Sequence, residues 1–258
     1  MCTVAVFLIT LFSFSGLYAH HEAIFGPQSA TLISKKRFVS TQYHFSNGGR
    51  SPAPLSHSHI GILSFGASVS RQWALSAILP FEAERGEEKA DGLQDLALAI
   101  RYFPELGPRK WLIVTFTLEP PTGNLEHDAV GLGGGVIYGT EWRNWSVIGY
   151  GLERTESSLE EGEKRGNRLF LGGGLAYEGG GFPVSPQLGV SWEHAGRSWE
   201  DGRLMDSSDS SVLMLHPTLA REFHSFNTFL GLSLPVAQRS GDEAWKRSRV
   251  AVGMVWGF

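Results

Sequence analysis

Cysteine is almost absent from this chain of 258 residues, because the only one, Cys2, lies at the very start of the sequence. We expect that stretch to be removed on export, which leaves the mature chain without any cysteine. This excludes disulfide bonds, a thiol nucleophile and a cysteine-ligated zinc site.

Basic residues and long apolar runs are also scarce. Lys and Arg number 22 against 26 Asp and Glu, so the formal net charge is −4 and no basic stripe is present to neutralise phosphates. Nucleic acid is therefore not expected as a partner. After residue 20, no apolar run approaches the ~20 residues that a membrane-spanning helix needs.

The first 37 residues divide into two predicted parts. Residues 1–19 are predicted to be a signal peptide, since residues 4–12 form an apolar core and Ala19 offers a cleavage position. The alternative is a retained anchor helix, which the shortness of this apolar segment opposes. Residues 20–37 are predicted to form a periplasmic amino-terminal arm or a plug.

Glycine and aromatic residues are abundant, with 32 glycines and an aromatic fraction of 12%. From Phe38 onward, apolar and polar residues alternate, so that Val39 and Phe45 share a face opposite Ser40 and His44. The alternation runs through about twelve segments of roughly ten residues, the length that a tilted strand needs to cross an outer membrane. We therefore predict that residues 38–258 form an all-β, transmembrane, antiparallel up-and-down β-barrel of about 12 strands.

Long and short connections alternate between these segments. The long polar ones fall near residues 46–56, 82–92, 119–128, 153–167, 194–210 and 238–246. The short ones fall near residues 70–71, 104–109, 143–144, 179–181 and 222–225. Long external loops and short periplasmic turns are typical of an outer-membrane barrel, so we expect a location in the outer membrane of a Gram-negative bacterium.

The last nine residues, Val250 to Phe258, fit a barrel strand. Val250, Met254 and Phe258 share a large face, and the opposite face is mostly small. The stretch resembles the carboxy-terminal signal of bacterial outer-membrane proteins, which implies the barrel-assembly machinery as a partner that reads Phe258.

Aromatic residues gather at the predicted periplasmic ends of the strands. Such rings prefer the membrane–water boundary, which predicts a girdle at this end. Its predicted members are Phe38, Trp73, Tyr102, Trp111, Trp142, Trp145, Tyr177, Phe182, Phe223, Phe226, Trp256 and Phe258.

The inward positions are predicted to be mostly small. Glycines there either leave a narrow channel, make room for the arm as a plug, or permit the bending that a small barrel needs. The predicted channel-lining ionisable residues are Asp95, Arg101, Glu119, Glu141 and His216, with His44 on the same inward face.

One stretch carries a family resemblance. Residues 70–81, which contain Leu79-Pro80, are followed by Asp91-Gly92-Leu93-Gln94-Asp95 and then by Arg101-Tyr102. This segment of about thirty residues resembles the outer-membrane transporter family of the MetA pathway of phenol degradation, although Gln94 stands where that family has a second glycine. The resemblance implies an outer-membrane barrel that passes small hydrophobic or aromatic compounds, and it carries over no catalytic residue.

The segment His44-Phe45-Ser46-Asn47-Gly48 suggests an alternative function. It is similar to a stretch of outer-membrane phospholipase A, in which Ser46 would attack an ester and His44 would act as the base. The alternation turns His44 toward the lumen, however, and no Asn or Asp on the next segment is placed to orient it. Asn-Gly is also ordinary turn chemistry.

A metal site at the mature amino terminus is a further alternative, since His20 and His21 would lie beside a free amino group. Our main expectation is nevertheless a channel for small molecules, with no enzymatic activity and no cofactor. Its expected partners are the solute, outer-membrane lipid and lipopolysaccharide. A structural or adhesive barrel that presents its long loops is the remaining alternative.

Overall fold

The computed structural model describes residues 37–46, 57–85, 90–107, 109–123, 129–156, 166–177, 184–200, 203–204, 209–223, 226–239 and 248–258. The predicted signal peptide, residues 1–19, and nearly all of the predicted arm, residues 20–37, lie outside these ranges. Within them, no helix is long and apolar enough to cross a membrane.

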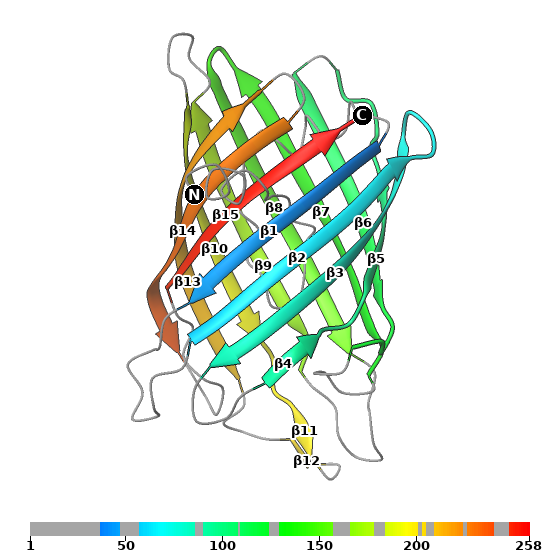
Figure 1. Ribbon diagram of the computed structural model, residues 1–258, viewed down its shortest axis with the longest axis vertical. Coiled ribbons are helices and arrows are strands. Elements are labelled where there is room, and N and C mark those ends of the chain that lie inside the picture. The colour runs from blue at the N-terminus through cyan, green and yellow to red at the C-terminus, as the bar shows by residue number, and fades with distance from the viewer. Residues whose placement is uncertain are drawn as a thin grey trace, which may run out of the picture.

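Twelve antiparallel strands form one closed barrel, as the alternation predicts. Each strand pairs with its neighbour in the chain, and the circle closes between β1 and β15 and between β2 and β3 (Figure 1). The strands are β1 (Arg37–Ser46), β2 (His57–Ser68), β3 (Trp73–Arg85), β5 (Ala97–Tyr102), β6 (Lys110–Glu119), β7 (Gly131–Trp142), β8 (Trp145–Glu156), β9 (Arg168–Tyr177), β10 (Ser185–Ala195), β13 (Ser210–Glu222), β14 (Phe226–Arg239) and β15 (Arg249–Gly257).

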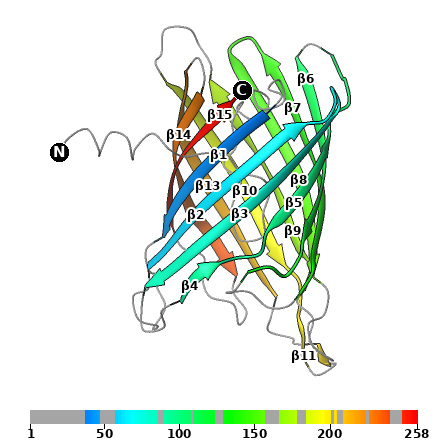
Figure 2. The ribbon, with the colours of Figure 1, turned by 45° about the vertical axis from the view of Figure 1, so that its right-hand side comes forward.

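Three short strands complete the structure. β4 (Ala90–Leu93) extends the β5 side of the wall and also pairs with β3, while β11 (Trp199–Glu200) and β12 (Arg203–Leu204) form a separate small hairpin. All three lie at the end of the barrel opposite the carboxy terminus (Figures 1 and 2). We call this end the long-loop end, because the long connections leave from it, and the other the short-turn end.

The short turns have local physical causes. β7 and β8 are joined by Arg143 and Asn144 alone, and Arg143 adopts a left-handed conformation with φ of 55°. Between β2 and β3, the Ser70 hydroxyl accepts hydrogen bonds from the backbone N–H groups of Gln72 and Trp73 at 3.2 and 3.1 Å. Both turns lie where the sequence predicts them.

The carboxy-terminal strand closes the barrel against the first strand. The β1–β15 ladder runs from Phe38 opposite Gly257 to Ser46 opposite Arg249. At its end, Arg37 and Phe258 exchange two backbone hydrogen bonds of 3.2 and 3.0 Å. Closure leaves neither strand with a free edge, which is the condition for a sheet to cross a bilayer.

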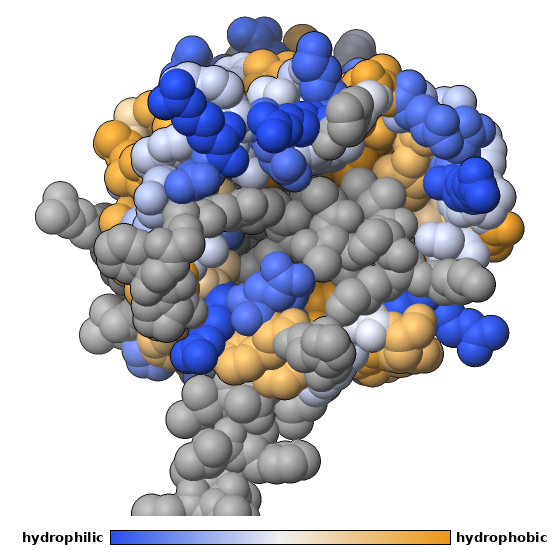
Figure 3. Space-filling view, turned by 90° about the horizontal axis from the view of Figure 1, so that it is seen from above, coloured by the Kyte–Doolittle hydropathy of each residue, from blue (hydrophilic) through white to orange (hydrophobic). Residues whose placement is uncertain are grey.

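The outer face is a band of exposed apolar side chains. Many outward positions carry Leu, Phe or Val. The exposed fraction of the residue is 58% for Phe116, 52% for Leu132 and 51% for Leu230. Seen from the short-turn end, hydrophobic residues follow the flank and hydrophilic residues gather at the rim (Figure 3). A soluble monomer does not expose so continuous an apolar surface, whereas a lipid-facing barrel requires one.

The predicted girdle is present at the short-turn end, with two exceptions. Rings of neighbouring strands pack against each other in tilted pairs, with centroid distances of 4.8 Å for Trp73–Tyr102 and 4.9 Å for Trp145–Tyr177. Phe38 and Trp111 were assigned to this girdle wrongly, because both side chains point inward. Phe182, another predicted member, lies outside the described residues.

Candidate functional site

The inner wall carries its densest charge at the long-loop end. Arg154 on β8 lies between two carboxylates, with Nη2 2.5 Å from Glu119 Oε2 and Nη1 2.9 Å from Glu156 Oε1. Glu119 belongs to β6, so the arginine reaches across β7. It does so at Gly131, where an added Cβ would lie 3.1 Å from Glu119 Oε2 and 3.3 Å from Arg154 Nη2. The glycine therefore leaves the space in which the pair forms.

A second inward ion pair follows the wall in the same manner. Arg168 on β9 lies 3.5 Å from Glu193 on the adjacent strand β10. On β3, Glu82 accepts a hydrogen bond from Ser58 at 2.6 Å and another from the Gln94 amide. These polar contacts join strands that are neighbours or next neighbours, so they run along the wall and do not cross the barrel.

Asp95, a predicted lining residue, accepts backbone hydrogen bonds where the ladder between β5 and β6 ends. The β5–β6 ladder stops at Leu98 opposite Leu118, and Pro120 and Pro121 follow without an N–H to donate. The Asp95 carboxylate accepts the next two backbone N–H groups, from Thr122 and Gly123, at 2.6 and 2.7 Å. The second aspartate of the Asp-Gly-Leu-Gln-Asp stretch thus substitutes for missing backbone pairs.

The structure also places the remaining predicted lining residues. His216 is 1% exposed in the wall, where its Nε2 lies 2.7 Å from the Ser191 hydroxyl and its Nδ1 lies 3.0 Å from the Ser233 hydroxyl. Arg101 and Glu141 occupy inward positions near the short-turn end, half-buried and exposed respectively. The predicted set is therefore spread over the wall and does not form one cluster.

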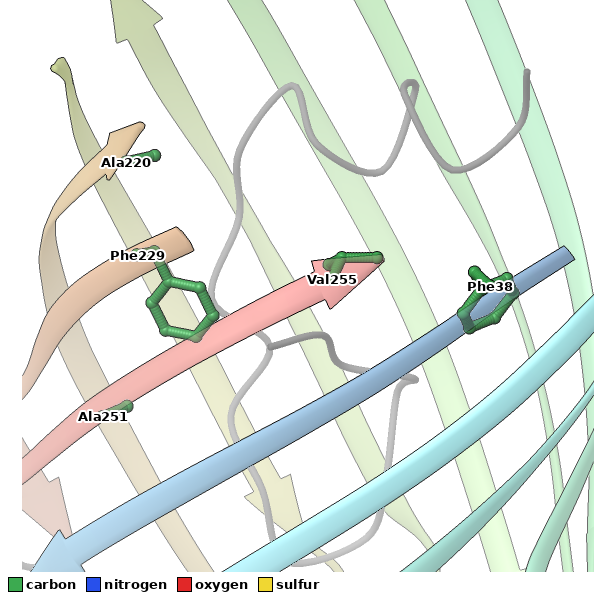
Figure 4. Packing of buried hydrophobic residues seen from close by; sticks show 5 residues of the cluster. All are labelled: Phe38, Ala220, Phe229, Ala251 and Val255. Atoms are coloured by element: carbon green, nitrogen blue, oxygen red, sulfur yellow. The ribbon is translucent and has the colours of Figure 1, made fainter. Parts of the chain in front are cut away.

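The inner wall carries an apolar cluster at the short-turn end. A cluster of buried side chains there joins four neighbouring strands, β13, β14, β15 and β1 (Figure 4). Its members are Phe38, Ala220, Phe229, Ala251 and Val255. Trp111 and Ile113 on β6 continue this apolar surface on the far side of the barrel.

Inward glycines provide seats for large side chains of the neighbouring strand. A Cβ on Gly66 would lie 1.9 Å from the Phe38 ring, and one on Gly139 would lie 2.1 Å from the Trp111 indole. The Tyr150 side chain occupies the same space over Gly172, at 2.3 Å. Rings placed in this way cover the backbone of the next strand, so these glycines serve to seat side chains as well as to bend strands.

His44 and Ser46, the residues of the alternative hydrolase, both face the lumen side and are buried. His44 Nε2 donates a hydrogen bond to Gln42 Oε1 at 2.7 Å. A lipid ester would approach from the outer face, where neither side chain is presented. No observed contact joins His44 to Ser46, so the geometry offers no support for a nucleophile–base pair.

Among the described residues, no group of three or more His, Cys, Asp or Glu side chains is arranged to hold a metal ion. His20 and His21 lie outside these ranges, so their predicted role stays a prediction.

Several charged residues of the inner wall were missed by the sequence reasoning. Arg154, Glu156 and Arg168 fall at the borders of a region predicted to be a loop, yet β8 continues for 12 residues and β9 starts with Arg168. Continued alternation was the available signal, because Arg154 and Glu156 keep the parity of the buried Ile148 and Tyr150.

Known structures share this fold. The COG4313 outer membrane channel from Pseudomonas putida F1 is similar at a TM-score of 0.76 and 17% identity, over 87% of this chain and 96% of that one. The NanC porin has a TM-score of 0.56 and 10% identity, over 86% and 100% of the two chains. The β-domain of the Bordetella autotransporter BrkA has a TM-score of 0.55 and 11% identity, over 86% and 100%.

No protein-family profile and no curated protein matches the chain. The resemblance to the phenol-degradation family therefore gains no support from sequence comparison. The closed barrel with an apolar outer band has the fold of outer-membrane β-barrels, and it locates the chain in the outer membrane.

Proposed function

We propose that this barrel is a passive channel for small solutes across the outer membrane. The observation that carries the proposal is a set of inward polar atoms that are buried and lack a hydrogen-bond partner in the part of the chain that the structure describes. They include Gln42 Nε2 on β1, Ser76 Oγ on β3, Gln187 Nε2 on β10 and Asn227 Oδ1 on β14.

Each such atom costs about 1–3 kcal/mol unless water or a solute satisfies it. A dry apolar interior would leave them unpaired, whereas a polar interior that holds ordered water molecules supplies their partners. They lie on four different strands, β3, β1, β14 and β10, each separated from the next by one strand. A water-filled interior is the simplest environment that fits all four.

One inward ring near the short-turn end bears on the class of solute. Trp111, which is half-buried on β6, would contact an apolar or aromatic group in transit, as the resemblance to the phenol-degradation transporters implies. The similarity to a channel and a porin supports passage of solutes without identifying one.

Two partners follow from the same proposal. The exposed outer band would contact outer-membrane lipid and, beside the long loops, lipopolysaccharide. Phe258, which is 68% exposed at the short-turn rim, would be available to the assembly machinery.

The test is reconstitution of the purified chain in planar bilayers and in lipid vesicles. We expect stepwise conductance and vesicle swelling in solutions of small sugars or alcohols. Absence of both, with a barrel that migrates as folded on an unheated gel, would contradict the channel.

A further inference from the structure

Four side chains gather on the outer face of the barrel where β1 ends and β2 begins, at the long-loop end (Figures 1 and 2). The Tyr43 hydroxyl lies 2.5 Å from Nδ1 of His59. The Phe45 ring stacks on the His57 ring with centroids 6.0 Å apart, and its centroid lies 5.2 Å from that of the His59 ring. All four residues are half-buried on outward positions. We call this group the imidazole patch.

The imidazole patch lies at the height of the outer membrane boundary. Along β2, the outward Phe65 is exposed, and toward the long-loop end the outward positions become His59 and His57. Ser68, at the short-turn end of β2, lies nine residues from His59. At ~3.3 Å per residue and a tilt of ~40°, this separation is about 23 Å along the membrane normal, close to the ~25 Å height of an apolar band. The patch therefore meets lipid headgroups rather than acyl chains.

The outer face differs elsewhere at this end. Leu118 near the end of β6 and Leu132 near the start of β7 keep it apolar. On β8, the outward Glu153 carboxylate accepts a hydrogen bond from the Asn167 amide at 3.1 Å. Among the described side chains of β15, β1, β2 and β3, by contrast, no outward position carries a carboxylate. The two imidazoles of the patch therefore face the boundary without a competing acid, which suits an anion.

The contacts within the patch also orient a donor outward. When the Tyr43 hydroxyl donates to Nδ1 of His59, the ring proton resides on Nε2, the nitrogen on the other side of the ring. Gly61 is the next outward position on β2, and nothing lies within 4 Å of an added Cβ there. The space beside the His59 ring is thus open to a group that approaches from the lipid.

We propose that the imidazole patch binds a phosphate group of the outer-leaflet lipid, namely the phosphorylated lipid A headgroup of lipopolysaccharide. The imidazole N–H groups donate to the phosphate oxygens, and a protonated ring donates more strongly. Tyr43 and Phe45 hold the rings at the boundary, where aromatic side chains are stable. The inference rests on the outer-membrane location and not on the passage of solutes. It assigns the contact with lipopolysaccharide to particular residues and to one chemical group.

The double variant His57→Phe/His59→Phe tests the proposal, because it keeps two rings beside Phe45 and removes the imidazole nitrogens. His194→Phe on β10 is the matched control. His194 also faces outward at the long-loop end, but it is a single imidazole that stacks on Trp192 with centroids 5.5 Å apart. Migration of each full-length barrel on an unheated gel verifies that it is folded.

Native mass spectrometry of the purified barrel, titrated with lipid A, measures the dissociation constant. We expect this constant to rise at least ~10-fold in the double variant, which loses hydrogen bonds to a charged group, and to change less than about twofold in His194→Phe. Dephosphorylated lipid A should bind the unmodified barrel at least ~10-fold more weakly than lipid A does. Equal affinities of the unmodified barrel and the double variant, or of the two forms of lipid A, would overturn the proposal.

Inorganic phosphate distinguishes a lipid site from a site for a free anion. We expect it to bind the unmodified barrel far more weakly than lipid A, because it lacks the acyl chains that lie along the apolar band below the patch. If inorganic phosphate binds as tightly as lipid A and the double variant loses both, the patch takes a free anion and the assignment to lipid is wrong.

Discussion

The two ends of the inner wall both hold long side chains beside a glycine, one end through charged groups and the other through aromatic rings. At the long-loop end, Glu119, Arg154 and Glu156 lie against the wall through ion pairs that bridge a glycine. At the short-turn end, Phe38 and Trp111 lie against the wall as rings seated on glycines. In both cases a glycine leaves the space in which a long side chain of another strand lies, so the glycines of this barrel position side chains at both ends.

Breaking the charged end should have the largest effect on stability. Arg154→Met leaves two buried carboxylates without their cation, and we expect a loss of about 3–5 kcal/mol in the free energy of unfolding. The measurement is urea unfolding of the barrel in lipid vesicles. Arg239→Met, which removes an exposed partner of Asp209, is expected to cost less than about 1 kcal/mol. Equal losses in the two variants would show that burial of the Arg154 group does not matter.

Loss of a ring from the apolar cluster at the short-turn end should lower the free energy of unfolding by a smaller amount. Phe229→Ala removes a side chain that is 6% exposed within the cluster, and we expect a loss of about 3 kcal/mol by the same unfolding assay. Phe116→Ala, on the lipid face, is the matched control and should lose less. If both lose the same stability, the inward cluster is not packed as described.

Adding a methyl group to an inward glycine that lies under a ring should affect both stability and conductance. Gly139→Ala places a methyl group where the Trp111 indole lies, so we expect a loss of about 1–3 kcal/mol and a lower single-channel conductance as the ring is displaced into the lumen. Gly61→Ala is the control, because nothing lies within 4 Å of its added Cβ. Unchanged conductance in Gly139→Ala would contradict the role of the seat in setting the bore.

The smallest expected effect concerns ion selectivity. Among the residues whose side chains the structure describes, the inward ionisable groups at the long-loop end comprise five carboxylates, on Glu82, Asp95, Glu119, Glu156 and Glu193, against three guanidinium groups, on Arg154, Arg168 and Arg249. This excess predicts a weak preference for cations, measured as a reversal potential in a KCl gradient.

Glu82→Gln should reduce that potential, whereas Glu141→Gln at the short-turn rim should reduce it less. A preference for anions in the unmodified chain would contradict the assignment of the long-loop end as the acidic mouth.

Much of the fold follows from the sequence because alternation and turn spacing are local properties. The alternation alone predicts which side of the sheet Val39, Ser40 and Phe45 face, without reference to the neighbouring strands. The faces of Phe38 and Trp111 were misassigned because proximity to a turn was given more weight than parity. The glycines that receive them, Gly66 and Gly139, lie on other strands, at positions that only the register reveals.

The candidate site depends more heavily on register, and less of it was predictable. Asp95 and Glu119 were recognised as inward, but their partners Gly123 and Arg154 lie 28 and 35 residues away in the chain. Sequence reasoning has no means of pairing such positions without the order and stagger of the strands. Arg154 was missed for a further reason, because charged residues at the end of a strand look like the start of a loop.

The seated rings also bear on how this chain can vary. A glycine and the ring above it fill one volume between two strands, so neither position is free to change alone. Trp111→Gly would open room for a large residue at position 139, and the exchange would leave the inner surface nearly the same. Substitutions at such pairs should therefore be coupled, each tolerated mainly in the presence of the other, as expected for residues in direct contact. The unit of variation on this inner wall is the pair of facing positions rather than the single residue.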